Sequence, residues 1–259
     1  MEYAFFILMI LVLGYVLYRN MNMLNKYKHN RDYIECYRKM LEKDESAYDD
    51  ICKYIEKETL EEFKSKAYVL KFHEELDRGL DYKNSLDSIN MEELFYANGR
   101  FSASKLSNNI DAFIWLFMDL AKARQLSKFD VMNELKEKMS NLSGLEDRVE
   151  YRLFMAIYNA LNEKEDGGIE FLNQLLDGSY YELQYDKGLI NMYKRFASAT
   201  LAYSNEPLED YYKEDLHEFA ATSIGGNFMR DLEIYDKYLP REVIAEQIKE
   251  ETEEEENKA

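Results

Sequence analysis

Two stretches of the sequence, Ser46-Ala-Tyr-Asp-Asp-Ile-Cys-Lys-Tyr-Ile55 and Asp81-Tyr-Lys-Asn-Ser-Leu-Asp-Ser-Ile89, superpose with an offset of 35 residues. The offset places Ile51 over Leu86 and Tyr54 over Ile89. Along the rest of the chain, apolar residues recur at helical spacing in blocks of roughly 12 to 19 residues separated by short polar breaks. Repeats of this length are typical of stacked helical hairpins, because each hairpin buries its apolar face against the next.

The polar breaks divide the chain into five predicted helical hairpins, and the composition favours helices throughout. Two prolines and ten glycines in 259 residues are few for a protein built of sheets and turns. Gly79 lies between the helices of the second pair, where a left-handed C-terminal cap favours glycine. We therefore expect an all-α fold whose paired helices are residues 30–43 with 46–57, 60–78 with 80–89, 108–126 with 128–139, 150–163 with 168–177, and 187–205 with 208–221.

Small residues recur in the first helix of these pairs, where they permit close helix crossing. They are Ala67, Ala121, Ala123, Ala156, Ala160, Ala197, Ala199 and Ala202. The pattern resembles the tetratricopeptide-repeat superfamily, in which each unit is a helical hairpin of about 34 residues. Asp77-Arg-Gly-Leu-Asp-Tyr-Lys-Asn-Ser-Leu86 is similar to the inter-helix turn of that family, and Asp166-Gly-Gly-Ile-Glu-Phe-Leu172 is a second instance. The resemblance implies a TPR-like solenoid whose first helices line a concave peptide-binding groove. Membrane-tethered bacterial members commonly act as adaptors or quality-control scaffolds.

The N-terminal residues carry the strongest hydropathy signal. Sixteen uncharged residues run from Tyr3 to Tyr18, and only positive charges lie between Arg19 and Arg31. A helix of that length spans about 24 Å against a bilayer core of about 30 Å, so flanking residues must assist. A cleaved signal peptide is the alternative, but Glu2 precedes the run and no small-residue cleavage site follows it. We expect a single transmembrane anchor that contacts the membrane through Tyr3, Phe5, Phe6, Ile7, Leu8, Ile10, Leu11, Leu13, Leu17, Tyr18 and Arg19.

The excess of positive residues after this run predicts a single-pass protein of the cell membrane with a cytoplasmic C-terminal part. Polar, small residues around Asn98-Gly99 predict a loop, and Val243, Ile244 and Ile248 predict a last amphipathic helix that caps the array. The expected organisation is residues 1–20 as the transmembrane anchor, 21–97 as the first helical hairpins, 98–108 as the loop, 109–248 as the C-terminal hairpins and cap, and 249–259 as an acidic disordered tail.

The charge of the chain restricts its partners. The formal net charge is −18, and the cluster from Glu250 to Glu256 contributes to it. Binding to nucleic acid phosphates requires clustered Lys and Arg, so the sequence predicts no nucleic-acid partner. An acidic field attracts basic segments of other proteins. The predicted partner is therefore an unknown protein or peptide, with basic segments favoured.

No residue pattern predicts a catalytic site, a cofactor site or a metal site. His29, His73 and His217 lie far apart, and His73-Glu-Glu-Leu-Asp77 is interpreted as a solvated charged face. Ser102-x-x-Lys105 matches a serine-enzyme motif by chance, because the companion motifs are absent. Gly225-Gly226 is interpreted as an inter-helix turn, although its backbone N–H groups could also face an anion.

Two apolar features are assigned to packing. Cys36 and Cys52 are predicted to be buried small residues on apolar helical stripes, because neither has a CxxC partner. Ala112-Phe-Ile-Trp-Leu-Phe-Met118 is the most apolar stretch after the N-terminal run and contains Trp115, the single tryptophan. We expect this stretch at the centre of the core.

These observations favour a membrane-anchored scaffold or adaptor that holds a protein or peptide at the cytoplasmic face, and not an enzyme. One alternative is a structural subunit of a membrane protein complex that is recognised through its transmembrane helix. Another is a membrane-tethered enzyme. An enzyme would be distinguished by a deep pocket holding a buried carboxylate or histidine, which the sequence does not lead us to expect.

Overall fold

The computed structural model describes residues 27–162, 167–178, 187–239 and 243. A first helix covers residues 27–41. The elements after it are α2 Ala47–Lys57, α3 Glu61–Asp77, α4 Lys83–Ser88, α5 Met91–Phe95, β1 Tyr96–Ala97, β2 Arg100–Phe101, α6 Ala103–Asn108, α7 Ile110–Gln125, α8 Phe129–Ser140, α9 Val149–Leu161, α10 Gly167–Asp177, α11 Lys187–Tyr203, α12 Asp210–Ala220, α13 Ser223–Asp231 and the 3₁₀ helix η1 Tyr235–Tyr238. The predicted helical character of the chain is confirmed.

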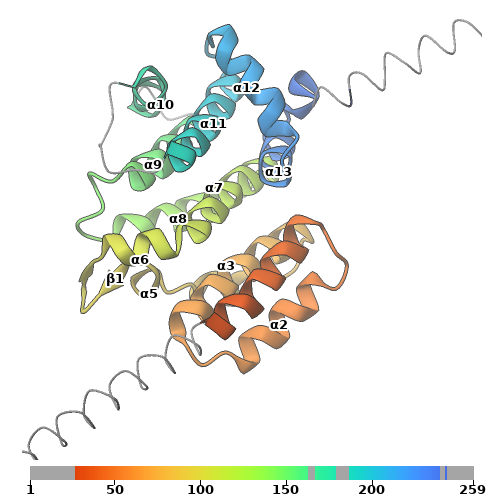
Figure 1. The fold of residues 1–259 in the computed structure, drawn as a ribbon, viewed down its shortest axis with the longest axis vertical. Helices are drawn as coiled ribbons and strands as arrows, with labels where there is room; N and C mark the ends of the chain where they lie inside the picture. The colour runs from red at the N-terminus through yellow and green to blue at the C-terminus, as the bar shows by residue number, and fades with distance from the viewer. Residues whose placement is uncertain (1–26, 163–166, 179–186, 240–242, 244–259) are drawn as a thin grey trace, which may run out of the picture.

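The paired helices expected from the apolar blocks are present. Helix α3 pairs with α4, α7 with α8, α9 with α10, and α11 with α12. Helix 27–41 contacts α2 through the Lys39–Asp50 ion pair and the hydrogen bond from the Tyr54 hydroxyl to the His29 carbonyl. The first helices of successive pairs pack side by side, α3 on α7, α7 on α9 and α9 on α11, as Figure 1 shows. Helix α13 then folds back, packing against α12 and α7 and contacting α11.

One turn recurs where the first helix of a pair ends. The second residue after the helix has a positive φ of 53° to 66°, and the N–H of the residue that follows donates to the carbonyl five positions earlier, at 2.8 to 3.0 Å. This is the Schellman cap, which satisfies carbonyls that a helix end leaves open. The residues with positive φ are Lys43, Gly79, Ser127 and Asn205. Because Gly79 alone among them is glycine, the other turns carry no glycine signal in the sequence.

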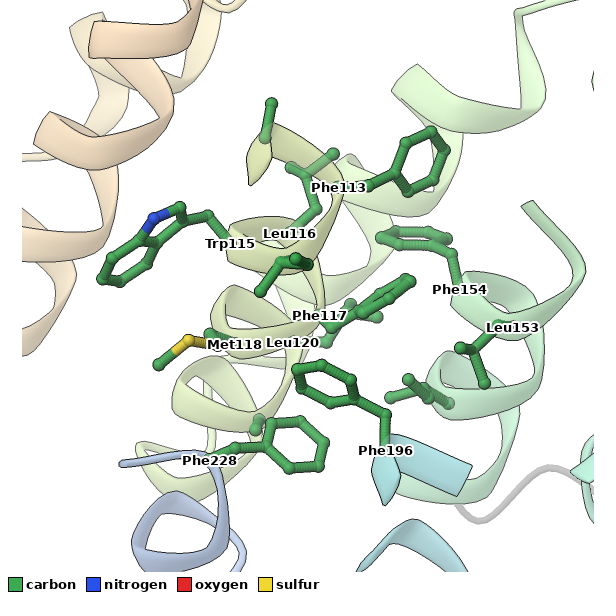
Figure 2. Packing of buried hydrophobic residues seen from close by; sticks show 14 of the residues in the cluster. Phe113, Trp115, Leu116, Phe117, Met118, Leu120, Leu153, Phe154, Phe196 and Phe228 are labelled. Carbon is green, nitrogen blue, oxygen red and sulfur yellow. The ribbon is translucent and has the colours of Figure 1, made fainter. Parts of the chain in front are cut away.

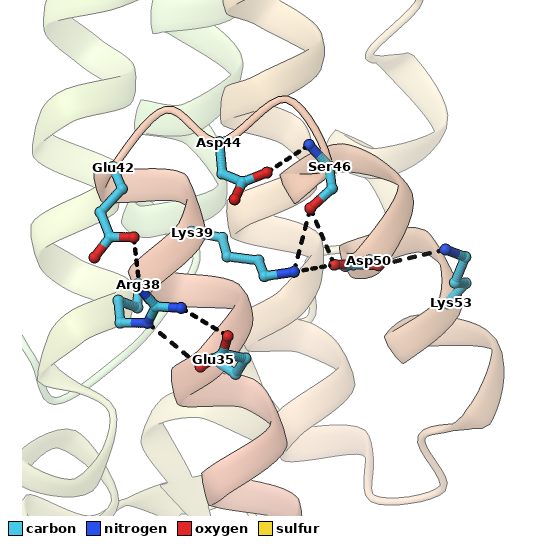
Figure 3. A network of polar contacts seen from close by, with 8 residues as sticks. All are labelled: Glu35, Arg38, Lys39, Glu42, Asp44, Ser46, Asp50 and Lys53. Carbon is cyan, nitrogen blue, oxygen red and sulfur yellow. Dashed lines mark hydrogen bonds and ion pairs between the residues drawn. The ribbon is translucent and has the colours of Figure 1, made fainter.

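Side chains reinforce the turn of the first hairpin (Figure 3). Asp44 accepts a hydrogen bond from the backbone N–H of Ser46 at 2.7 Å. Lys39 reaches across the turn and forms an ion pair with Asp50 of α2 at 2.5 Å. These contacts fix the angle at which α2 returns along helix 27–41.

The predicted centre of the core is confirmed. Phe113 and Phe117 are fully buried and Trp115 is 1% exposed. The ring of Phe117 lies 5.3 Å from that of Phe196 on α11, and Phe196 lies 4.8 Å from Phe228 on α13. Figure 2 shows Trp115 on the opposite side of α7, toward the N-terminal helices. Helix α7 therefore joins the two halves of the array through two apolar faces.

The segment 98–108, expected as a loop, has regular structure in the described chain. Asn98 and Gly99, with φ of 54° and 69°, form the turn of a short antiparallel hairpin in which β1 pairs with β2. Asn-Gly suits such a turn because both positions require a positive φ. Ser102 then begins α6 by accepting a hydrogen bond from the Lys105 N–H at 3.3 Å. The Ser-x-x-Lys spacing is thus a helix cap.

The predicted transmembrane helix is wrong as a feature of this fold. No helix within the described residues has both the length and the apolar character needed to cross a bilayer. Within the described part of the chain, the apolar stretch Ala112–Met118 lies in α7, which has 16 residues and carries Asp111, Asp119, Lys122 and Arg124. Sixteen helical residues extend only about 24 Å, and buried charges in lipid are costly. The prediction of a single-pass protein of the cell membrane depended on that helix and is wrong for the same reason.

Several sequence predictions fall on residues that are not described. The predicted anchor residues from Tyr3 to Arg19 lie outside the described part of the chain, as do Ile244, Ile248 and the acidic tail 249–259. Within the described part, Cys36 is buried and Cys52 is half-buried, and both are free thiols. The prediction for the cysteines is therefore confirmed for Cys36 and only partly for Cys52.

Candidate functional site

Charged side chains from three helices meet where α13 contacts the array. We call this group the α13 cluster, and its members are His73 and Asp77 of α3, Asp119 and Lys122 of α7, and Asp231 of α13. Spacings of four and three residues place each pair on one helix face. The interpretation of His73–Asp77 as a solvated face is wrong for His73, which is 8% exposed.

Lys122 connects the three helices. Its Nζ lies 2.6 Å from Asp77 Oδ1 and 2.5 Å from Asp231 Oδ1. Burial by itself would lower the pKa of Lys122, but the hydrogen bonds with Asp231 and Asp77 outweigh it and raise that pKa. Lys122 therefore stays charged, and it fixes the end of α13 to α3 and α7.

Asp119 and His73 form a second, deeper pair in the cluster. Nδ1 of His73 lies 2.8 Å from Oδ1 of Asp119, whereas Oδ2 of Asp119 is buried without a partner in the described residues. Burial raises the pKa of Asp119 to about 6, although the contact with His73 opposes the shift. Burial likewise raises the pKa of Asp231. Asp119 and Asp231 thus lie in an environment that resists their ionisation, whereas the hydrogen bond and charge of Lys122 outweigh burial at Asp77 and lower its pKa.

A hollow of about 480 Å³ lies at the opposite ends of α3 and α7. We call it the amide hollow, and its lining residues are Tyr27, Asn30, Glu62, Phe63, Lys66, Asn108 and Asn109. Asn109 begins α7 and donates to the Leu94 carbonyl at 2.8 Å. The Tyr27 side chain is 70% exposed, and Phe63 supplies a buried apolar wall. The lining combines aromatic surface with carboxamide groups.

The charges around the amide hollow are already paired. Nζ of Lys66 lies 2.9 Å from Asp111, and Glu62 lies 3.1 Å from Lys105. By contrast, the carboxamides of Asn30 and Asn108 make no hydrogen bond with the described residues. The polar groups left for a ligand are therefore mainly neutral amides, which both donate and accept hydrogen bonds.

A second hollow, of about 550 Å³, separates the end of helix 27–41 from the turn between α12 and α13. The interpretation of Gly225-Gly226 as an inter-helix turn is wrong, because both residues lie within α13. The alternative anion contact is not available either, because the Gly225 N–H donates to the Thr222 hydroxyl at 3.0 Å and the Gly226 N–H donates to the Thr222 carbonyl at 2.8 Å. A Cβ on Gly225 would collide with the Phe219 carbonyl. The glycines thus permit α12 and α13 to approach closely.

The histidines each have a separate partner. His29 lies 2.8 Å from Glu58, and Nδ1 of His217 lies 2.7 Å from the Leu239 carbonyl. Among the described residues, no three His, Cys, Asp or Glu side chains are grouped so that they could hold a metal ion. His73 and Asp119 line neither of these two hollows.

Sequence reasoning missed Asp119, Lys122 and Asp231. The available signal was the position of Asp119, a charged residue four positions after Trp115 within the most apolar helix. An acidic group at such a position requires a buried partner. Comparison of the chain with protein-family models, curated proteins and solved structures found no match.

Proposed function

We propose that this chain is a helical-hairpin scaffold that binds a peptide segment of a partner protein in the amide hollow. The observation that carries the proposal is that half-buried Asn30 and exposed Asn108, whose carboxamides make no hydrogen bond with the described residues, lie beside aromatic surface at the ends of stacked helices. A volume of about 480 Å³ falls within the range of ligand pockets, about 300 to 1,000 Å³. It suits a few side chains of an extended segment.

The chemistry of the lining indicates how a peptide would be held. A carboxamide can donate to a backbone carbonyl and accept from a backbone N–H, so Asn30 and Asn108 match a peptide group. The exposed ring of Tyr27 offers an apolar face and a hydroxyl group. Recognition would then depend on the peptide backbone and on one apolar side chain.

The charge of the chain favours a basic partner. Because Lys66 and Glu62 are paired, the hollow itself contributes little net charge. The formal charge of −18 over the whole chain creates a long-range field that speeds the approach of basic segments and weakens with salt. The field would bring the partner to the surface, and the amides would select it.

A photo-crosslinking amino acid at position 108 tests the proposal. The crosslinked product should contain the same segment of a partner protein in each experiment. The same amino acid at the exposed position 137 on α8 should not capture that segment. A synthetic copy of the segment should bind the unmodified chain and lose about tenfold or more in affinity to Asn30→Ala/Asn108→Ala, because two hydrogen bonds are removed. Equal capture at both positions, or unchanged affinity, would contradict the proposal.

A further inference from the structure

The hollow of about 550 Å³ lies between the turn that follows helix 27–41 and helix α13. We call it the turn hollow. Lys43 lines it from the side of the turn, and Ser223, Asn227 and Arg230 line it from α13. A ligand in the turn hollow would therefore contact elements from both ends of the described chain.

The two cations of the turn hollow have no carboxylate partner. Lys43 and Arg230 are exposed, and neither forms an ion pair with the described residues. The guanidinium of Arg230 lies 4.0 Å from the centre of the Tyr235 ring and donates to Oδ1 of Asn227 at 3.3 Å. These contacts orient the guanidinium without neutralising its charge, because Tyr235 and Asn227 carry no negative charge.

Two acidic residues near Lys43 have other partners. Glu42, which also lines the turn hollow, pairs with Arg38 at 2.5 Å, as Figure 3 shows. Asp77, on which Lys43 acts at longer range, lies 2.6 Å from Lys122. The charge of Lys43 is therefore available to an anion from outside the described residues.

We propose that the acidic segment Glu250–Glu256 of this same chain binds in the turn hollow, where its carboxylates pair with Lys43 and Arg230. The segment contains six glutamates and lies outside the described residues. Hydrogen bonds from an ammonium or a guanidinium group to a carboxylate are charge-assisted, and the guanidinium fork also fits a carboxylate in a bidentate manner.

The course of the chain favours its own segment over an acidic peptide from another protein. Val243, the last described residue, itself lines the turn hollow. Glu250 follows seven positions later, and an extended chain of that length spans up to about 25 Å. A tether this short gives the segment an effective concentration in the millimolar range, which favours it over a dilute free peptide.

The net charge of the chain acts in the same direction. A chain with a formal net charge of −18 repels an acidic segment over most of its surface, so a hollow with two unpaired cations is the favoured place for it. This inference does not depend on the proposed function. Tyr27 and Asn30 line the amide hollow from the start of helix 27–41, whereas the turn hollow lies at the end of that helix.

Zero-length crosslinking of the full-length chain with a carbodiimide tests the inference, because this reagent joins a lysine amine to a carboxylate only when the two are in contact. At about 0.1 M salt, mass spectrometry should identify a crosslink between Lys43 and a glutamate of the segment 250–256. The yield should fall at 1 M salt, because the Debye length shortens from about 10 Å to about 3 Å.

Lys57 is the internal control for this crosslink. It is also exposed, lies in the last turn of α2 and forms no ion pair with the described residues, so it should not crosslink to the segment. Absence of the Lys43 crosslink, or equal yields from Lys43 and Lys57, would overturn the inference.

A mixture of unlabelled chains and chains labelled with heavy nitrogen identifies the source of the segment. Both peptides of each crosslinked product should carry the same label, because the segment belongs to the same chain. Products that join a labelled to an unlabelled peptide would assign the segment to a second copy, and the inference would then be wrong.

Two variants test the contribution of Arg230. Arg230→Gln removes one cation and keeps Lys43 for crosslinking, so the yield at Lys43 should fall about threefold, the effect of one exposed ion pair. Arg100→Gln makes the same change at an exposed position of β2 and should leave the yield unchanged. An undiminished yield in Arg230→Gln, or an equal fall in both variants, is contrary to the inference.

Discussion

Two buried carboxyl groups, those of Glu58 and Asp119, have pKa values that are shifted in opposite directions. Glu58 lies between α2 and α3, and its side chain is 1% exposed. It accepts hydrogen bonds from the N–H groups of Thr59 and Leu60 at 2.7 and 2.8 Å and from the Tyr54 hydroxyl at 2.7 Å, and His29 lies 2.8 Å away. Asp119 is fully buried and has His73 as its partner.

The difference shows that burial alone does not determine the pKa of a carboxyl group. Burial acts to raise the pKa of Glu58, but the surrounding donors outweigh it and the pKa is lowered. The single contact of Asp119 does not outweigh burial, and its pKa rises to about 6. The number of donors therefore decides whether the ion is stabilised. Glu58 therefore stays charged and connects α2 and α3 at neutral pH, whereas Asp119 binds a proton more readily than an exposed carboxyl group does.

Glu58→Leu should produce the largest effect. It leaves the Tyr54 hydroxyl and the Thr59 and Leu60 N–H groups without their acceptor in a buried site. Such losses cost about 3 to 5 kcal/mol, which urea unfolding at pH 7 would measure as a lower free energy of unfolding. Glu137→Leu, at an exposed position, should change stability by about 0.5 kcal/mol or less. Similar losses in both variants would mean that the donors around Glu58 contribute nothing.

The next effect is the pH dependence due to Asp119. Since its folded-state pKa is raised to about 6 from 3.8, the folded chain holds this proton more strongly than the unfolded chain. Its contribution is fully present below about pH 4 and is lost as the pH rises through about 6. The free energy of unfolding relative to Asp119→Asn should therefore fall by about 2 kcal/mol between pH 4 and 7. Parallel stability curves would contradict the assignment.

Glu58 should show the reverse sign. Its lowered pKa means that its contribution is present above the ordinary value of 4.5 and is lost as the pH falls through the folded-state pKa. Glu58→Gln should cost about 2 kcal/mol at pH 7, because bonds to a charged acceptor are stronger than bonds to an amide. The difference between the two proteins should shrink in acid. A difference that grows in acid would place Glu58 in the same class as Asp119.

The sequence predicted the hairpins because they are local. Apolar spacing identified α3, α7, α9 and α11 with their partner helices, and Gly79 marked one turn correctly. The Asn98-Gly99 hairpin could also have been predicted, since this dipeptide is a strong turn signal. Local periodicity is strong where a helix buries one face against its neighbour in the chain.

The α13 cluster could not be predicted because its contacts are remote. His73 and Asp119 are 46 positions apart, and Asp231 lies in a helix that returns to α7 after the intervening hairpins. The turns at Lys43 and Ser127 use residue types that rarely take a positive φ, so they leave no turn signal, whereas the asparagine at position 205 is a type that such turns favour. Periodicity indicates that a face is buried, but it does not identify what lies opposite.

Glu233→Gly should have the smallest effect and separates backbone strain from charge. Glu233 follows α13, is exposed and has a φ of 58°, while the next N–H binds the Met229 carbonyl at 3.0 Å. Glycine adopts this conformation without strain, so the free energy of unfolding, measured by urea unfolding, should rise by about 0.5 to 1 kcal/mol. The same change at position 137, within α8, should instead destabilise by about 1 kcal/mol. A loss of stability in both variants would mean that the positive φ of Glu233 stores no strain that glycine can relieve.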